Sequence, residues 1–328
     1  MSFIDGDGPS AAEIRAARAR LGSRIATTPC WTWPSESLRA ALGDGARVSA
    51  KLELWQRTGS FKVRAALLCA LDLDDAARAR GVTAVSAGNH ALAVAYAART
   101  AGTDAKVVMP KTADPRRIAA CREAGATVVL SDDVHAAFAE ALRLARDEGR
   151  RFIHPFESEQ VVLGTATIGL EIATHVPDVE AVVVPIGGGG LCAGIACALG
   201  RLLPACKVYG VEPTGADTMN KSFEAGRPMA IDAVRTIADS LGAPRAEPMT
   251  FGLCKRWVAG LVRVTDDELR AATRVLHREL SLAVEPACAA STAAALGPLA
   301  EELAGRKVVL VLCGSNIDLA SVARHAGA

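Results

Sequence analysis

The chain has 328 residues, with 37 Lys and Arg against 36 Asp and Glu, and its net charge of +1 gives no electrostatic reason to bind nucleic acid or an acidic membrane surface. Half of the residues are apolar but only 4% are aromatic, a mixture that suits buried parallel strands covered by helices of small residues. At about 150 residues per domain, the length predicts two domains, with a core that needs no disulfide or metal to be stable.

Cysteine usage predicts a reducing compartment. The nine cysteines are odd in number and irregularly spaced, and they form neither a CxxC pair nor a zinc-like cluster with histidine. Residues 1–10 contain no apolar stretch typical of a secretory signal, so we expect a cytoplasmic protein with free thiols. The uncharged run over residues 181–200 has the length of a membrane span, but Pro185 and four glycines interrupt it, which indicates strand, turn and helix.

Helical and strand patterns alternate along the chain, which predicts an α/β fold. In the first half we expect helices over residues 11–21, 60–71, 91–101, 116–124 and 134–147, and strands over residues 47–52, 82–86, 105–109 and 127–130. In the second half we expect strands over residues 181–186, 207–211 and 307–312, and helices over residues 191–203, 266–279 and 291–304. Residues 212–254 are the least regular stretch and are expected to form loops near a functional opening.

A run of four glycines follows the strand predicted over residues 181–186. Gly187, Gly188, Gly189 and Gly190 lead through Leu191 into a helix, where backbone N–H groups and the helix dipole favour a bound phosphate. Two alternatives remain open. The run can be a flexible turn, or the dinucleotide loop of an oxidoreductase, although Cys192 then stands where the GxGxxG pattern has its last glycine.

Lys62 is the candidate nucleophile. It follows Gly59 and Ser60, which mark the start of a predicted helix, and it lies between the apolar Phe61 and Val63. Burial and a helix N-terminus both disfavour the charged amine, and a neutral amine can attack a carbonyl. Most lysines lie on the surface, so a solvated side chain is the alternative that the local sequence leaves open.

Two further clusters follow predicted strands, at the place where open parallel sheets bind ligands. The first consists of Ser86, Ala87, Gly88, Asn89 and His90, whose N–H groups would bind a carboxylate while the Asn89 amide meets a ligand hydroxyl. A plain helix cap is the alternative. In the second cluster, Cys313 would offer its thiol to a ring nitrogen, or would simply be a buried cysteine at the end of a strand.

Taken together, these clusters resemble the fold type II pyridoxal-phosphate enzymes, and among them the serine/threonine dehydratase and serine racemase family. The resemblance runs from about residue 11 to the C-terminus and rests on the segments KLELWQRTGSFK, SAGNH, HPF, GGGGL, VEP, TIAD, EP and CGSN in this order. It implies a two-domain α/β fold, similar to the tryptophan synthase β chain, with open, twisted, mostly parallel sheets and helices on both faces. Residues 1–79 and 158–328 would form a large cofactor-binding domain, and residues 80–157 a small domain that closes on the substrate.

The resemblance also implies a role for each cluster. Lys62 would hold pyridoxal 5'-phosphate as a Schiff base and, once released, remove the α-proton of the substrate; Phe61 would pack near the ring. The cofactor phosphate would bind to the loop from Gly187 to Leu191, its ring hydroxyl would contact Asn89, and its pyridine nitrogen would contact Cys313. The substrate carboxylate would bind to the N–H groups of Ser86, Ala87, Gly88, Asn89 and His90.

Several positions depart from the family pattern. Ala87 replaces the serine that acts as second base in racemases, so racemisation is not expected as the main activity. The family's metal site maps to Glu212, Ala216 and Thr218, where a hydroxyl replaces a carboxylate; this weakens the case for a divalent cation, with Glu212 and Ala216 as the remaining candidates. Ala65, Ser240 and the segment GTAT over residues 164–167 also differ, which predicts a reshaped substrate pocket. No regulatory domain is expected after Asn316, so we expect no allosteric control by an end product.

The activity implied by the resemblance is that of an ammonia-lyase, or dehydratase. It would eliminate water from a 3-hydroxy L-amino acid, such as threonine, serine or a related compound, and would yield a 2-oxo acid and ammonia. A β-replacement enzyme or an amino-acid racemase of the same fold is the alternative, and a nucleotide-binding oxidoreductase is the alternative from another class. We expect a small amino-acid substrate, no nucleic-acid or membrane partner, and a homodimer.

Overall fold

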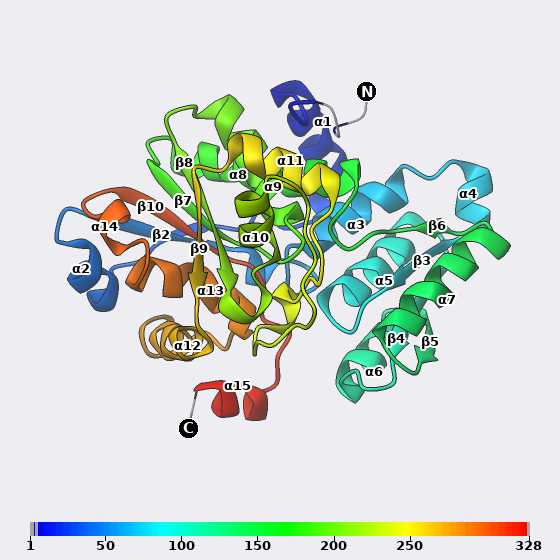
Figure 1. The fold of residues 1–328 in the computed structure, drawn as a ribbon. Coiled ribbons are helices and arrows are strands. Elements are labelled where there is room, and N and C mark those ends of the chain that lie inside the picture. Colours follow the sequence, from blue (N-terminus) through cyan, green and yellow to red (C-terminus); the bar gives the residue numbers. More distant parts are fainter. Residues whose placement is uncertain (1–2, 4–5, 327–328) are drawn as a thin grey trace.

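The computed structural model describes residue 3 and residues 6–326 (Figure 1). The first ten residues, which contributed to the expected cytoplasmic location, therefore lie partly outside the described residues. Within the described part of the chain, no helix is both long enough and apolar enough to cross a bilayer.

Two separate sheets organise the molecule. The larger has the order β1-β2-β10-β7-β8-β9, and every neighbouring pair is parallel except β1 and β2. The smaller has the order β5-β4-β3-β6 and is entirely parallel. In the order of the sheets, the strands are β1 (Cys30–Thr32), β2 (Arg47–Leu52), β10 (Lys307–Leu312), β7 (Ala181–Pro185), β8 (Lys207–Pro213) and β9 (Gly260–Val264), then β5 (Thr127–Ser131), β4 (Ala105–Pro110), β3 (Val82–Val85) and β6 (Arg151–Phe152).

Helices cover both faces of the larger sheet, with α8 and α9 on one side and α12 and α13 on the other (Figure 1). In the same view α5, α6 and α7 surround the smaller sheet. The α-helices are α1 (Ala11–Leu21), α2 (Glu36–Leu42), α3 (Lys62–Leu71), α4 (Asp75–Arg80), α5 (Asn89–Ala101), α6 (Pro115–Glu123), α7 (Val134–Asp147), α8 (Glu159–His175), α9 (Gly190–Leu202), α10 (Thr218–Ala225), α11 (Pro248–Trp257), α12 (Asp266–Leu280), α13 (Pro286–Leu296), α14 (Ala300–Leu303) and α15 (Leu319–Ala326).

The helices α5 and α9 begin differently from many of the other helices. Ser35, Asp74, Asp133, Ser158 and Thr265 each accept a hydrogen bond from the N–H group three residues later, which satisfies the first turn of their helices. By contrast, α5 and α9 begin after glycines and have no side-chain cap. Their first N–H groups therefore stay available to a ligand.

A buried group of charged side chains ties three helices to the larger sheet. Arg64 of α3 donates to Glu53 at 2.8 Å and to Glu171 of α8 at 2.8 and 2.9 Å, and Lys51 of β2 donates to Glu171 at 2.6 Å. Arg18 of α1 reaches the same carboxylate at 2.8 Å. Burial alone would raise the pKa of Glu171, but the charge of Arg64 lowers it to about 2. Because Arg64 lies in the first turn of α3, this network holds the N-terminal end of that helix in place.

Most predicted elements are present, with bounds that shift by a few residues. The helix predicted over residues 291–304 is wrong: α13 starts earlier, at Pro286, and ends at Leu296, and a separate α14 follows a break at Gly297 and Pro298, because proline cannot continue the first helix. The stretch 212–254 is also more regular than expected, since it contains α10 and the first part of α11. The expected division into two domains over residues 80–157 and the remainder stays a prediction.

Candidate active site

A cavity of about 310 Å³ opens where β3, β7 and β10 end. The structure brings all of the predicted cofactor and substrate residues to its wall. They are Phe61, Lys62, Ser86, Ala87, Gly88, Asn89, His90, Gly187, Gly188, Gly189, Gly190, Leu191 and Cys313. The candidate metal ligands Glu212 and Ala216 are not part of this lining.

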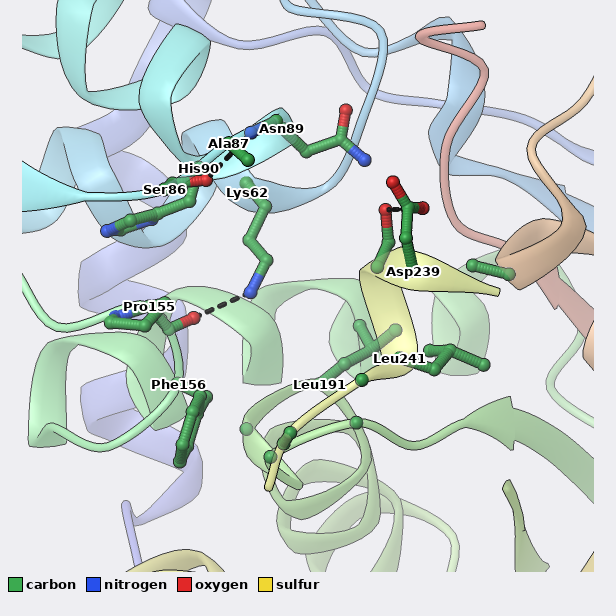
Figure 2. A pocket seen from close by; sticks show the side chains of 18 of the residues that line it. Lys62, Ser86, Ala87, Asn89, His90, Pro155, Phe156, Leu191, Asp239 and Leu241 are labelled. Atoms are coloured by element: carbon green, nitrogen blue, oxygen red, sulfur yellow. Dashed lines mark hydrogen bonds between the residues drawn. The ribbon is translucent and has the colours of Figure 1, made fainter. Parts of the chain in front are cut away.

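Lys62 is the first residue of α3, whereas the sequence predicted a helix that starts two residues earlier, at Ser60. Its amine donates a hydrogen bond to the carbonyl oxygen of Pro155 at 2.6 Å (Figure 2) and lies 5.0 Å from the centre of the Phe61 ring. Burial lowers the pKa of Lys62 to about 8. A substantial fraction of the amine is therefore neutral near pH 8, as a nucleophile for an aldehyde requires.

The glycine loop is packed so closely that side chains cannot be added at several positions. A Cβ atom on Gly188 would lie 2.1 Å from the ring of Phe156, and one on Gly190 would lie 2.6 Å from the Phe156 carbonyl oxygen. Gly189 has φ +91°, a conformation that side chains rarely adopt. Within the described residues, no acceptor receives the N–H groups of residues 187–191. This cradle at the start of α9 fits a phosphate monoester.

The loop before α5 presents a second set of N–H groups at the cavity wall. Gly88 precedes the helix, and its N–H donates to the hydroxyl of Ser86 at 3.0 Å. The N–H groups of Asn89 and His90 have no acceptor in the described part of the chain. His90 Nε2 lies 2.9 Å from the Ile153 carbonyl oxygen, and burial lowers the pKa of His90 to about 3. A neutral His90 that donates to this carbonyl holds the loop without adding charge.

Glu285 belongs to the EP segment that contributed to the family resemblance, but no role in the site was assigned to it from the sequence. Its buried carboxylate accepts hydrogen bonds from Asn89 Nδ2 at 2.9 and 3.0 Å, from the Asn316 N–H at 2.9 Å and from the Ser240 hydroxyl at 2.8 Å. Asn316 Nδ2 in turn donates to Asn89 Oδ1 at 2.5 Å. An acidic residue directly before Pro286, at the start of an otherwise apolar helix, is the signal that could have pointed to this role.

Cys313 lines the cavity directly after the end of β10. Its carbonyl oxygen accepts the N–H of Phe61 at 3.2 Å, which links the strand end to the residue before Lys62. A hydrogen bond with Cys288 and burial raise the pKa of Cys313 well above its usual value. The side chain is therefore a neutral thiol, suited to contact a ring nitrogen without placing a negative charge beside it.

Residues 154–157 join β6 to α8 and contact several parts of the site. His154 Nδ1 accepts the N–H groups of Phe156 and Glu157 at 3.2 and 2.8 Å, and burial lowers the pKa of His154 to about 4. Glu157 accepts the N–H groups of Met249 and Thr250 at 2.7 and 3.1 Å, at the start of α11. The segment thus connects the surroundings of Lys62 with the helix beside the glycine loop.

The candidate metal ligands are engaged within the protein. Glu212 accepts hydrogen bonds from the N–H of Met219 at 2.8 Å and from both nitrogens of Asn220 at 2.7 Å, and burial raises its pKa to about 7. Thr218 donates its hydroxyl to the Ala243 carbonyl oxygen at 2.6 Å. Over residue 3 and residues 6–326, no group of three or more His, Cys, Asp or Glu side chains is arranged to hold a metal ion.

Comparison with known proteins identifies the chemistry of this cavity. The family model described as "Pyridoxal-phosphate dependent enzyme" matches residues 22–314. The chain belongs to this family. It is 50% identical over 319 residues to a phenylserine dehydratase of Ralstonia pickettii, and the match covers 97% of each chain. Among solved structures, maize serine racemase has a TM-score of 0.91 at 31% identity, covering 97% of this chain and 96% of that one. Threonine deaminase isoform 2 of Solanum lycopersicum, in its processed form, has a TM-score of 0.89 at 32% identity, covering 98% and 96%.

This pyridoxal-phosphate enzyme has the fold type II architecture, with mostly parallel sheets and helices on both faces, as the sequence predicted. Its activity is that of an ammonia-lyase that dehydrates 3-hydroxy amino acids, which confirms the predicted reaction class. The amine of Lys62, the phosphate cradle and the neutral thiol of Cys313 fit the aldehyde, phosphate and pyridine of the cofactor.

Proposed function

We propose that the enzyme acts on 3-hydroxy amino acids with a bulky apolar group on Cβ, and that 3-phenylserine is such a substrate. The observation that carries this proposal is the apolar wall that α7 gives to the cavity. Phe138 and the half-exposed Val134 line it on the side of the smaller sheet. Leu241 and Pro244 add apolar surface from the irregular stretch before α11. The phenylserine dehydratase with half of its residues identical supports the same substrate class.

We assign the cofactor contacts by chemical fit. Lys62 would form the covalent link, the N–H groups of residues 187–191 would hold the phosphate, Asn89 would donate to the ring hydroxyl and Cys313 would face the pyridine nitrogen. When bound, pyridoxal phosphate supplies an electron sink that makes the α-proton of an amino acid acidic. A neutral thiol at the pyridine leaves that nitrogen unprotonated, which moderates the electron sink and favours early departure of the β-hydroxyl.

The protein supplies proton transfer and orientation. Lys62 accepts the α-proton after the substrate amine has displaced it, and its lowered pKa suits a base near neutral pH. The N–H groups of Asn89 and His90 orient the substrate carboxylate. Ala87 has no proton to give, so its methyl group disfavours racemisation. The β-hydroxyl would leave as water, and a water molecule would then hydrolyse the unsaturated product, so that ammonia and a 2-oxo acid are released.

Comparison of substrates tests the proposed specificity. We expect kcat/KM for 3-phenylserine to exceed that for threonine and serine by roughly tenfold or more, because an apolar pocket gains free energy from the phenyl group. Phe138→Ala should reduce this preference. Leu142→Ala, on the exposed side of the same helix, is the matched control. Equal kcat/KM values for the three substrates would refute the proposal.

The covalent role of Lys62 has its own test. The purified protein should show visible absorption from the bound cofactor, and borohydride should fix the cofactor to Lys62. Lys62→Ala should abolish both signals and lower turnover roughly 10²- to 10⁴-fold. Lys207→Ala, which removes an exposed lysine paired with Glu302, is the control and should behave like the unmodified protein. Retention of the absorption band in Lys62→Ala would contradict the assignment.

We also propose a cytoplasmic homodimer. All nine cysteines are free thiols, which supports a reducing compartment. Trp31 and Trp55 are large apolar side chains that are more than half exposed, and an interface between two copies would cover such surface. Light scattering of the purified protein tests the dimer: a mass of one chain at micromolar concentration would exclude it.

A further inference from the structure

Arg117 of α6 reaches across the mouth of the cavity from the smaller sheet. Its NH1 donates to Asp239 at 3.2 Å and its NH2 donates to the Asn316 carbonyl oxygen at 3.0 Å, while Glu285 lies 4.0 Å away. Only 18% of the Arg117 side chain is exposed, whereas 62% of the Asp239 side chain is exposed. The guanidinium thus lies inside the cavity mouth and is neutralised by a solvated carboxylate.

The position of this guanidinium relative to the loop before α5 suggests a second partner. A Cβ atom on Gly88 would lie 3.1 Å from Arg117 NH1, so the cation is in contact with the loop whose N–H groups face the cavity. The Nε–H of Arg117 has no acceptor within the described residues, and each terminal nitrogen has a second N–H that meets no acceptor in that part of the chain. A planar fork of this kind matches the two oxygens of a carboxylate.

We propose that Arg117 binds the α-carboxylate of the substrate together with the N–H groups of Asn89 and His90, and releases Asp239 as it does so. Ion pairs with an exposed carboxylate are weak, so the exchange of Asp239 for a substrate carboxylate that is also held by two backbone N–H groups is favourable. This inference rests on the carboxylate position in the proposed function, and it adds a charged contact from the smaller sheet to a site otherwise made of neutral donors.

A purely structural role for Arg117 is the competing explanation, because it also bridges the two sheets. Arg116 provides the matched control for this role. It pairs with Asp318 at 2.7 Å, so it makes the same kind of bridge, but it does not line the cavity. Removal of Arg116 should therefore disturb the bridge and leave the carboxylate contact intact.

The experiment compares ligands that differ only in the carboxylate. L-alanine is paired with ethylamine, and L-phenylalanine with 2-phenylethylamine. None of these compounds has a β-hydroxyl to eliminate, so equilibrium binding to the holoenzyme can be followed by the absorbance change of the cofactor. Arg117→Ala should weaken both amino acids roughly 10- to 100-fold and change the affinity for the two amines by less than about twofold. Arg116→Ala should leave all four affinities unchanged.

Two results would overturn the proposal. If Arg117→Ala lowered the affinities for amino acids and amines equally, Arg117 would act only through its structural bridge between the two sheets. If the affinity for amino acids did not change, Arg117 would make no contact with the carboxylate. If the unmodified holoenzyme binds alanine no better than ethylamine, the carboxylate placement in the proposed function itself fails, a result distinct from any effect of Arg117→Ala. Circular dichroism of each variant verifies that it folds.

Discussion

Asn89 donates its side-chain amide to both carboxylate oxygens of Glu285, at 2.9 and 3.0 Å. This pair joins the start of α5, in the smaller sheet region, to the start of α13, which packs on the larger sheet. Because the Asn89 oxygen is held by Asn316, the amide has one defined orientation, with its nitrogen toward the buried carboxylate. We therefore propose Glu285 as a positioning residue for Asn89, the residue that we assign to the ring hydroxyl of the cofactor.

Glu285→Ala should destabilise the protein and weaken cofactor binding. The change removes the acceptor of Asn89, of the Asn316 N–H and of the Ser240 hydroxyl, and a buried donor left without a partner costs about 1–3 kcal/mol. Urea unfolding should show this loss, and a cofactor titration should show a higher Kd. Glu301→Ala, at an exposed site on α14, should change neither quantity. An unaltered unfolding midpoint in Glu285→Ala would rule out the positioning role.

The lowered pKa of Lys62 predicts the pH dependence of cofactor loading. Only the neutral amine attacks the aldehyde, so the rate of association with apoprotein should rise with pH and level off above the pKa of about 8. A solvated lysine would continue to gain reactivity up to about pH 10.4. Stopped-flow mixing of apoprotein with pyridoxal phosphate between about pH 6.5 and 10 separates the two profiles. A rise that continues without a plateau to pH 10 would disprove burial of the amine.

The packing of the glycine loop predicts that a single methyl group will impair cofactor binding. In Gly188→Ala the new Cβ would collide with Phe156, so the loop must shift and its N–H groups lose their alignment. We expect the Kd of the cofactor to rise by roughly tenfold or more, equivalent to about 1.4 kcal/mol. Gly252→Ala is the control, because no atom lies within 4 Å of the added methyl group. That substitution should preserve cofactor affinity and slightly stabilise α11.

The buried charges around Arg64 predict a large effect on folding. Arg64→Met would leave Glu53 and Glu171 without their main partner, and breaking a buried ion pair in this way costs about 3–5 kcal/mol. Arg99→Met, at an exposed position on α5, should cost little. Denaturant unfolding compares the two, and similar midpoints would argue against the network.

The same network has a defined acid sensitivity. The pKa of Glu171 is lowered to about 2 from its ordinary value of 4.5, so its contribution to stability is complete above pH 4.5 and is lost as the pH falls toward 2. Glu171→Gln should flatten this part of the stability profile. If the unfolding free energies of the two proteins fell in parallel between pH 4.5 and 3, Glu171 would not be the titrating group.

The periodic parts of the chain could be predicted from sequence, because their apolar patterns reflect one buried face. The helix α7 matches its predicted bounds for this reason. The prediction did not include α8, which is surrounded by other helices and apolar on nearly all sides, so its sequence shows no clear polar face. The site could be predicted from the glycine and asparagine residues that follow the strand ends. Glycine is informative there because few other residues fit a closely packed turn.

Contacts between distant segments could not be predicted in the same way. Nothing near Arg117 in the sequence indicates that it meets Asp239, and the link between Asn89 and Glu285 spans 196 residues. Such pairs depend on how the two sheets are placed, which local patterns do not encode. The family resemblance supplied the candidate residues, and the structure supplied the groups that orient them.

The segment over residues 154–157 should make the resistance of the enzyme to proteases depend on bound cofactor. Pro155 holds the Lys62 amine, Phe156 fills the space beside Gly188, and Glu157 anchors α11. Because this segment lies against Lys62 and the glycine loop, a bound cofactor should restrain it further, so we expect the apoprotein to open there first and to be cut there by proteases. Limited proteolysis with and without pyridoxal phosphate would reveal this difference. In a cell, the same difference would let proteases selectively remove enzyme molecules that have lost their cofactor.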